Sequence, residues 1–199
     1  MLPMSFEVRP EQPADREAVR RVVTAAFGAD DPGHGSDVAQ IWESLGRHRR
    51  AGLVAEERGV VTGHVGLSQG WVDARRDLVE VWVLSPLSVV PERQSEGFGT
   101  ALVAAALETA RGSGTPALFL EGSPVYYGER GFERADRHGF LPPALGRTPP
   151  AAFQVAVFEA HEPWMTGQLI YPSVWWEHGA AGLRDPRLAE LEERFAPLD

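Results

Sequence analysis

Residues 94–100 combine a glutamine, small residues and two glycines directly after an apolar run, a pattern suited to binding a phosphorylated ligand. The apolar run, residues 87–90, predicts a buried strand, and the residues that follow predict an amphipathic helix. The first amides of a helix have no backbone partner, so they bind anions with help from the helix dipole. Gly97 and Gly99 lack a Cβ atom, which lets a phosphate approach the backbone closely. The alternative is that both glycines only allow close packing of strand and helix.

Two motifs, in this order along the chain, resemble the GNAT N-acetyltransferase superfamily. Pro-x-x-Gln-x-x-Gly-x-Gly at residues 91–99 resembles its acetyl-CoA signature, Gln/Arg-x-x-Gly-x-Gly/Ala. Tyr-Gly-Glu-Arg-Gly-Phe at residues 127–132 looks like the Tyr-x-x-x-Gly-Phe element that closes the GNAT core. Ser-Pro-Leu-Ser-Val at residues 85–89 and Ser-Pro-Val-Tyr-Tyr at residues 123–127 are similar to a bacterial subgroup of uncharacterised predicted acetyltransferases. The resemblance extends over most of residues 6–171.

The resemblance implies a mixed α/β (α+β) fold, in which helices flank a splayed, mostly antiparallel central sheet. Acetyl-CoA would enter between the fourth and fifth strands, and Ser85-Pro86 would form the bulge that opens the sheet. Three strand residues would pair with the pantetheine through backbone groups: Leu87, Ser88 and Val89. The segment that would cradle the pyrophosphate comprises Gln94, Ser95, Glu96, Gly97, Phe98, Gly99 and Thr100.

The resemblance also implies catalytic roles for two side chains. Tyr127 matches the general acid that reprotonates the leaving CoA thiolate, and an ordinary tyrosine pKa near ~10 keeps it protonated at neutral pH. Its alternative role is packing of a helix on the core, which is the role expected of Tyr126. Glu80 is the candidate general base, because several GNAT enzymes place a carboxylate on this strand and its parity with Trp82 predicts an inward side chain. A paired or solvated charge is the alternative for Glu80, and Glu121 is a weaker candidate.

Composition excludes several kinds of chemistry. The 199 residues contain no Cys and, since every basic residue is Arg, no Lys. The chain therefore has no disulfide, thiolate nucleophile, Cys-ligated zinc or Schiff-base lysine. Acyl transfer through an enzyme thioester is excluded, which favours direct attack by an amine. The six His residues show no metal-ligand spacing, so no metal site is expected, and the net charge of −9 argues against nucleic acid as a ligand.

The dense basic cluster of Arg47, Arg49 and Arg50 is expected to be a solvated loop, with an anion-contacting patch as the alternative. The longest apolar run, residues 101–107, is far shorter than the ~18 residues of a membrane span. The first residues lack the pattern of a secretory signal. We therefore expect a cytoplasmic protein without a membrane partner, and family analogy alone suggests a homodimer.

Hydrophobic periodicity predicts a single domain over residues 1–199, with residues 172–199 as a C-terminal extension. Helices are expected from Pro13 to Gly28, from the cap Ser36 to Gly46 after a loop at residues 33–35, and at residues 97–111, 124–130 and 186–195. Strands are expected at residues 5–9, 52–56, 60–71, 78–90, 116–121, 153–158 and 168–171.

The function expected from these observations is acetyl-CoA-dependent N-acetyl transfer to a primary amine of a small molecule. Two alternatives stay open. One is a catalytically silent protein of GNAT fold that binds CoA or a protein partner. The other is a domain that binds a different phosphorylated ligand at the same helix start.

Overall fold

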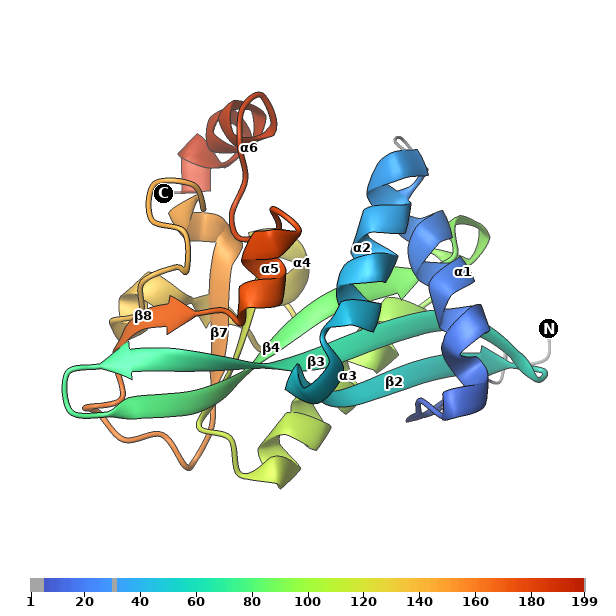
Figure 1. Ribbon diagram of the computed structural model, residues 1–199, viewed down its shortest axis with the longest axis horizontal. Helices are drawn as coiled ribbons and strands as arrows, with labels where there is room; N and C mark the ends of the chain where they lie inside the picture. The colour runs from blue at the N-terminus through green and yellow to red at the C-terminus, as the bar shows by residue number, and fades with distance from the viewer. Residues whose placement is uncertain (1–5, 30–31, 199) are drawn as a thin grey trace. The chain divides into compact units, whose positions relative to one another are not determined.

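The computed structural model describes residues 6–29 and 32–198, which form two compact units (Figure 1). The first unit contains the residues up to Ser68 together with Leu84–Thr109. The second contains Gln69–Val83 together with the residues from Ala110 onward. Two long strands and one long helix run from one unit into the other, because the division falls inside them.

Across the described residues, eight strands form a mixed sheet in the order β1-β2-β3-β4-β5-β7-β6, and β8 pairs with β3. The β4–β5 ladder is parallel, whereas the ladders β1–β2, β2–β3, β3–β8, β5–β7 and β6–β7 are antiparallel. This confirms the expected mixed α/β class with a mostly antiparallel sheet. The strands are β1 (Glu7–Pro10), β2 (Arg49–Glu57), β3 (Val60–Ala74), β4 (Leu78–Val89), β5 (Ala117–Glu121), β6 (Glu133–Arg134), β7 (Phe153–Val157) and β8 (Gly167–Ile170).

The helices lie between and after these strands along the chain. They are α1 (Arg16–Phe27), α2 (Pro32–Ser44), α3 (Phe98–Ser113), α4 (Pro124–Gly128), α5 (Ser173–Glu177) and α6 (Arg187–Phe195). Among the described residues, none of the helices combines the length and the apolar character needed to cross a membrane.

In the first unit, helices cover both faces of β3. A Cβ atom at Gly66 would lie 2.5 Å from the Trp42 ring of α2, and one at Gly63 would lie 2.9 Å from Leu102 of α3. Residues an odd number apart on a strand face opposite sides, so α2 and α3 lie on opposite faces. Helix α1 packs beside α2, as Figure 1 shows, and buries Val22 of its apolar stripe.

In the second unit, β5 carries the centre of the core. Leu118, Phe119 and Leu120 are all buried. The Phe119 ring meets Phe140 edge-on, with centroids 4.8 Å apart, and stacks on Phe153 at 5.7 Å. Aromatic pairs of this kind add about 0.5–1.5 kcal/mol beyond their buried area, so they fix β5 firmly against its neighbours.

Helix α2 corrects one expectation. It begins at Pro32, and Ser36 lies inside it instead of capping it, so the expected loop at residues 33–35 is helical. Gly35 explains the error, because a Cβ atom at this position would clash with the Thr24 carbonyl of α1. Glycine costs about 1 kcal/mol in a helix interior, but here close contact between two helices requires it. The short elements β6 and α5 were also not expected from the sequence.

A buried polar pair lies in the core of the first unit. The His64 side chain is 0% exposed, its Nε2 atom lies 3.1 Å from Glu11 Oε2, and its ring is tilted against Trp42. Burial lowers the pKa of His64 below the ordinary 6.5, in spite of the nearby carboxylate. The imidazole is therefore neutral at neutral pH, as expected of a core histidine.

We expect the stability of the protein to fall with pH below 6.5, because the unfolded chain then binds a proton that buried His64 rejects. The contribution of neutral His64 to the free energy of unfolding is fully present above pH 6.5. It is lost as the pH falls toward the lowered pKa of His64 in the folded state. The slope contributed by one group is at most about 1.4 kcal/mol per pH unit. Urea unfolding between pH 5.5 and 7.5 should show this slope in the parent and in a His178→Gln control. It should disappear in His64→Gln, and an unchanged slope there would contradict the assignment.

Candidate active site

The loop between β4 and α3 bends sharply through two residues with left-handed backbone. Ser95 has φ +64° and Gly97 has φ +92°. Only glycine adopts such angles at no steric cost. A Cβ atom at Gly97 would have no other atom within 4 Å, so the backbone here borders open space. The loop can therefore present its amides, and those of the first turn of α3, to a ligand.

Arg93 connects this loop to the neighbouring elements. Its Nη2 atom donates to Glu57 Oε2 at 2.7 Å, and its Nε atom lies 3.1 Å from Glu96 Oε2. The guanidinium also lies 5.2 Å from the centroid of the Phe98 ring. One half-buried cation thus connects a strand, the loop and the start of α3, and it neutralises Glu96, one of the two acidic side chains of the loop.

Two further contacts fix the positions of the end of β4 and the start of α3. Gln94 Nε2 donates to the Val89 carbonyl at 3.1 Å, so the glutamine of the motif closes the turn. Phe98 is 1% exposed and stacks on Phe6 with ring centroids 4.1 Å apart. The side chains of Gln94 and Phe98 therefore make contacts within the protein. This leaves the backbone groups of these two residues available to a ligand.

Strand β4 leads into the loop as one continuous strand. The peptide bond between Ser85 and Pro86 is cis, and β4 continues through it to Val89. Ser88 and Val89 are buried. The parallel ladder of β4 with β5 comprises two pairs, Trp82↔Leu118 and Val83↔Phe119, both of which precede Ser85.

Tyr127 lies on α4 in the second unit, held by its neighbours in sequence. Ser123 caps this helix, its hydroxyl accepting from the Tyr126 amide at 3.4 Å. The Tyr127 ring lies over Gly122, where a Cβ atom would be 2.6 Å away, and meets Phe132 edge-on at 5.8 Å. Burial raises the pKa of Tyr127 above the ordinary 10. The phenol is therefore neutral at any physiological pH and keeps its proton.

Tyr126 has a different environment. The guanidinium of Arg130 lies 3.7 Å from the centroid of its ring, and the same side chain donates to the Tyr126 carbonyl. These contacts support the packing role expected for Tyr126.

Glu80 is exposed, and its Oε2 atom accepts from Gln69 Nε2 at 2.7 Å. The inward orientation expected from its parity with Trp82 is therefore wrong. Glu80 is the third residue of β4, close to the turn that joins β3 to β4, so its carboxylate is hydrated. A base that works through water needs such solvent contact.

Glu121 ends β5 in the second unit and is partly buried. Tyr171 donates to its Oε1 atom at 2.8 Å, and Thr148 donates to its Oε2 atom at 3.0 Å. Burial raises the pKa of Glu121 above the ordinary 4.5, and the two hydrogen bonds oppose that rise. The residue next to it, Gly122, contacts the Tyr127 ring, so the structure brings Glu121 and Tyr127 into one neighbourhood. No motif in the sequence indicated that Tyr171 or Thr148 lies near the site.

The family model of the acetyltransferase (GNAT) family matches residues 16–132. This chain belongs to the GNAT family. The matched range includes both motifs that suggested the resemblance, the glycine loop before α3 and the segment from Tyr127 to Phe132.

Relatives of this GNAT chain agree with that assignment. The uncharacterized N-acetyltransferase YjhQ of Escherichia coli (strain K12) is 29% identical over 157 residues, which cover 78% of this chain and 80% of YjhQ. A GNAT family acetyltransferase from Brucella melitensis, solved in complex with acetyl-CoA, matches with a TM-score of 0.69 and 28% identity over 86% of this chain and 99% of that one. YhbS from Escherichia coli, solved with CoA, has a TM-score of 0.77 and 24% identity over 92% of this chain and 98% of its own, which shows the GNAT fold.

Metal ligands are not grouped in this GNAT structure. Within residues 6–29 and 32–198, no three His, Asp or Glu side chains lie so that they could hold a metal ion together.

Proposed function

We propose that this GNAT protein transfers the acetyl group of acetyl-CoA directly to a primary amine of a small molecule. The observation that carries the proposal is the loop before α3, where Gly97 has a left-handed backbone and borders open space. The Brucella melitensis relative, solved with acetyl-CoA, supports the same donor.

The donor would be held by backbone groups more than by side chains. Leu87, Ser88 and Val89 are proposed to pair with the pantetheine, and the amides from Gln94 to Thr100 to bind the pyrophosphate. The dipole of α3 would contribute only about 0.3–2 kcal/mol to binding one phosphate. Each hydrogen bond from an amide to a charged oxygen contributes about 1.5–3 kcal/mol, so several amides together supply more of the affinity.

In the proposed reaction, the neutral amine attacks the thioester carbonyl, and a carbon–nitrogen bond forms. The tetrahedral intermediate then collapses, and the carbon–sulfur bond breaks to release the CoA thiolate. Tyr127 would give its phenolic proton to this sulfur, while the excess proton on nitrogen would leave to Glu80 through water. Positioning of the two reactants can lower the barrier by up to about 7–11 kcal/mol, more than a single acid or base supplies.

The test is steady-state transfer to a panel of primary amines, with mass spectrometry of the acetylated product. The chain contains no Cys, so a thiol reagent reports only the CoA that is released. Turnover with one or more amines is expected. Tight binding of acetyl-CoA without transfer to any amine would favour a catalytically silent CoA-binding protein. Equal binding of unrelated nucleotides would favour a domain for another phosphorylated ligand.

Glu80→Gln is expected to lower kcat/KM by about 10²-fold, the lower end for a general base, since water partly replaces an exposed carboxylate. Glu108→Gln, which removes an exposed carboxylate of α3, serves as the control and should behave like the parent. An unchanged kcat/KM in Glu80→Gln would remove Glu80 from the mechanism.

A further inference from the structure

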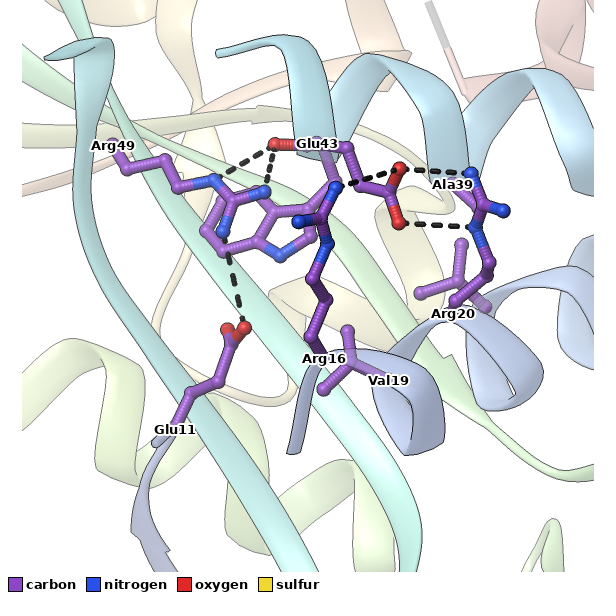
Figure 2. Close-up of a pocket in the computed structure, with 9 residues that line it drawn as sticks. Glu11, Arg16, Val19, Arg20, Ala39, Glu43 and Arg49 are labelled. Carbon is purple, nitrogen blue, oxygen red and sulfur yellow. Dashed lines mark hydrogen bonds and ion pairs between the residues drawn. The ribbon is translucent and has the colours of Figure 1, made fainter. Parts of the chain in front are cut away.

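Two carboxylates of this chain differ in the groups that hold them. In the first unit, Figure 2 shows Glu43 between two arginines, Arg16 and Arg20. Arg20 donates to both Glu43 oxygens, at 3.0 and 2.8 Å, and Arg16 lies 3.7 Å from one of them. In the second unit, Glu121 accepts its hydrogen bonds from two neutral hydroxyl groups instead. The charge of Glu43 is thus met by the protein, whereas Glu121 is only oriented by its partners.

Both hydroxyl groups belong to side chains that are fixed by burial. Tyr171 and Thr148 are buried, and the Tyr171 ring packs against Trp175 with centroids 5.0 Å apart. Each hydroxyl donates to a different Glu121 oxygen, at 2.8 and 3.0 Å. Because each oxygen of an ionised carboxylate can accept two hydrogen bonds, both keep capacity for a further donor. The Glu121 side chain is only partly buried, so a ligand can reach this capacity.

The charge of Glu121 is incompletely stabilised by the protein. Arg147 acts on it through its charge, but the Arg147 guanidinium lies 5.9 Å from the centroid of the Trp176 ring. In the part of the chain that the structure describes, no guanidinium donates a hydrogen bond to Glu121. Burial raises the pKa of Glu121 in spite of Arg147 and both hydroxyl groups, so these groups do not replace the lost hydration. A cation brought by a ligand would stabilise the ionised form.

The position of Glu121 relates it to the proposed reaction. On one edge, β5 pairs with β7 as far as Glu121 itself. On the other edge, the parallel ladder of β5 with β4 ends at Phe119, which pairs with Val83. Glu121 therefore lies past the end of this ladder, where acetyl-CoA is expected to enter between the two strands. The next residue, Gly122, lies against the ring of Tyr127, the proposed acid.

We propose that Glu121 binds a second cationic group of the acceptor, so that diamines are the preferred substrates; this inference rests on the proposed function. The attacking nitrogen must be neutral, and an ion pair with a carboxylate would favour its protonated form. The cation that Glu121 holds is therefore a different group of the same molecule. The role of Glu121 is to determine specificity, and the proton of the attacking nitrogen still leaves by way of Glu80.

Glu121→Gln separates the charge from the hydrogen bonds. The carbonyl oxygen of glutamine can accept from Tyr171, and its amide can donate to the Thr148 oxygen, so both contacts have a replacement. Glu177→Gln makes the same charge change at an exposed position of α5 and is the control. Thermal unfolding and acetyl-CoA affinity should match the parent in both variants.

The transfer experiment compares 1,4-diaminobutane with pentylamine, in which a methyl group replaces one amino group. In the parent, kcat/KM for the diamine is expected to be at least about tenfold higher, since a hydrogen bond to a charged group contributes this much. In Glu121→Gln the preference should disappear through slower transfer to the diamine alone. Glu177→Gln should keep it. A merely structural role of Glu121 would lower the transfer to both amines alike.

Calorimetric titration of the CoA complex with 1,4-diaminobutane tests binding without turnover. Saturable binding is expected in the parent and in Glu177→Gln, and it should weaken at least about tenfold in Glu121→Gln. Equal binding in all three proteins, or equal kcat/KM for both amines in the parent, would overturn the inference even if acetyl transfer is observed. Binding that depends on Glu121, without transfer to either amine, would overturn the proposed function and leave the cation site.

Discussion

Tyr127→Phe is expected to reduce kcat by about 10²–10⁴-fold and to leave the affinity for acetyl-CoA unchanged. The substitution removes only the phenolic oxygen and keeps the ring over Gly122 and against Phe132. Without that oxygen, the CoA thiolate would leave unprotonated or take its proton from water. Measurable activity should persist, because positioning of the two reactants does not depend on this hydroxyl.

Tyr126→Phe is the matched control, since it makes the same change at the adjacent residue of α4. The contacts of Tyr126 with Arg130 involve its ring and its carbonyl, which the substitution retains. We therefore expect near-parental kcat in Tyr126→Phe. Steady-state kinetics and calorimetry with acetyl-CoA on both variants test the assignment. A loss of acetyl-CoA binding in Tyr127→Phe, or an equal fall in kcat in both variants, would contradict the role of Tyr127 as the acid.

The loop before α3 could be predicted from the sequence because its geometry is local. Gly97 and Gln94 lie a few residues from the strand end and the helix start that they connect. Left-handed backbone at Gly97 follows from the residue type, and the hydrogen bond from Gln94 to Val89 spans five residues. The short helix that carries Tyr127 follows in the same way from the Ser123 cap and Pro124.

Contacts between distant residues could not be predicted in this way. Glu11 and His64 are 53 residues apart, and Glu121 and Tyr171 are 50 apart. Glu80 illustrates the same limit, because it shares a strand face with buried Trp82 but lies near the start of β4, where that face is exposed. Gly35 looked like a helix breaker until its contact with α1 was known. The basic cluster likewise does not form the expected solvated loop, because Arg49 and Arg50 begin β2 and Arg49 packs on Trp42 of α2.

Gly97→Trp is expected to weaken acetyl-CoA binding by at least about 100-fold, or about 2.7 kcal/mol. Gly97 has φ +92°, where a residue with a side chain is strained by about 1–3 kcal/mol. A Cβ atom at this position would meet no other atom within 4 Å, so the added side chain starts in open space. That same space is where the diphosphate is proposed to approach the loop amides. The variant should therefore fold and yet exclude the donor.

Gly114→Trp is the control that distinguishes backbone strain from exclusion of acetyl-CoA. Gly114, which follows α3, has φ +80° and also no atom within 4 Å of an added Cβ, so the backbone strain and the added volume are matched. The midpoint temperature of thermal unfolding should fall to a similar extent in both variants, because a side chain at either position is strained by the left-handed backbone. Calorimetry should then show parental acetyl-CoA affinity in Gly114→Trp and a loss in Gly97→Trp. If both variants bind acetyl-CoA like the parent, the loop does not hold the diphosphate, and the donor must bind elsewhere in the chain.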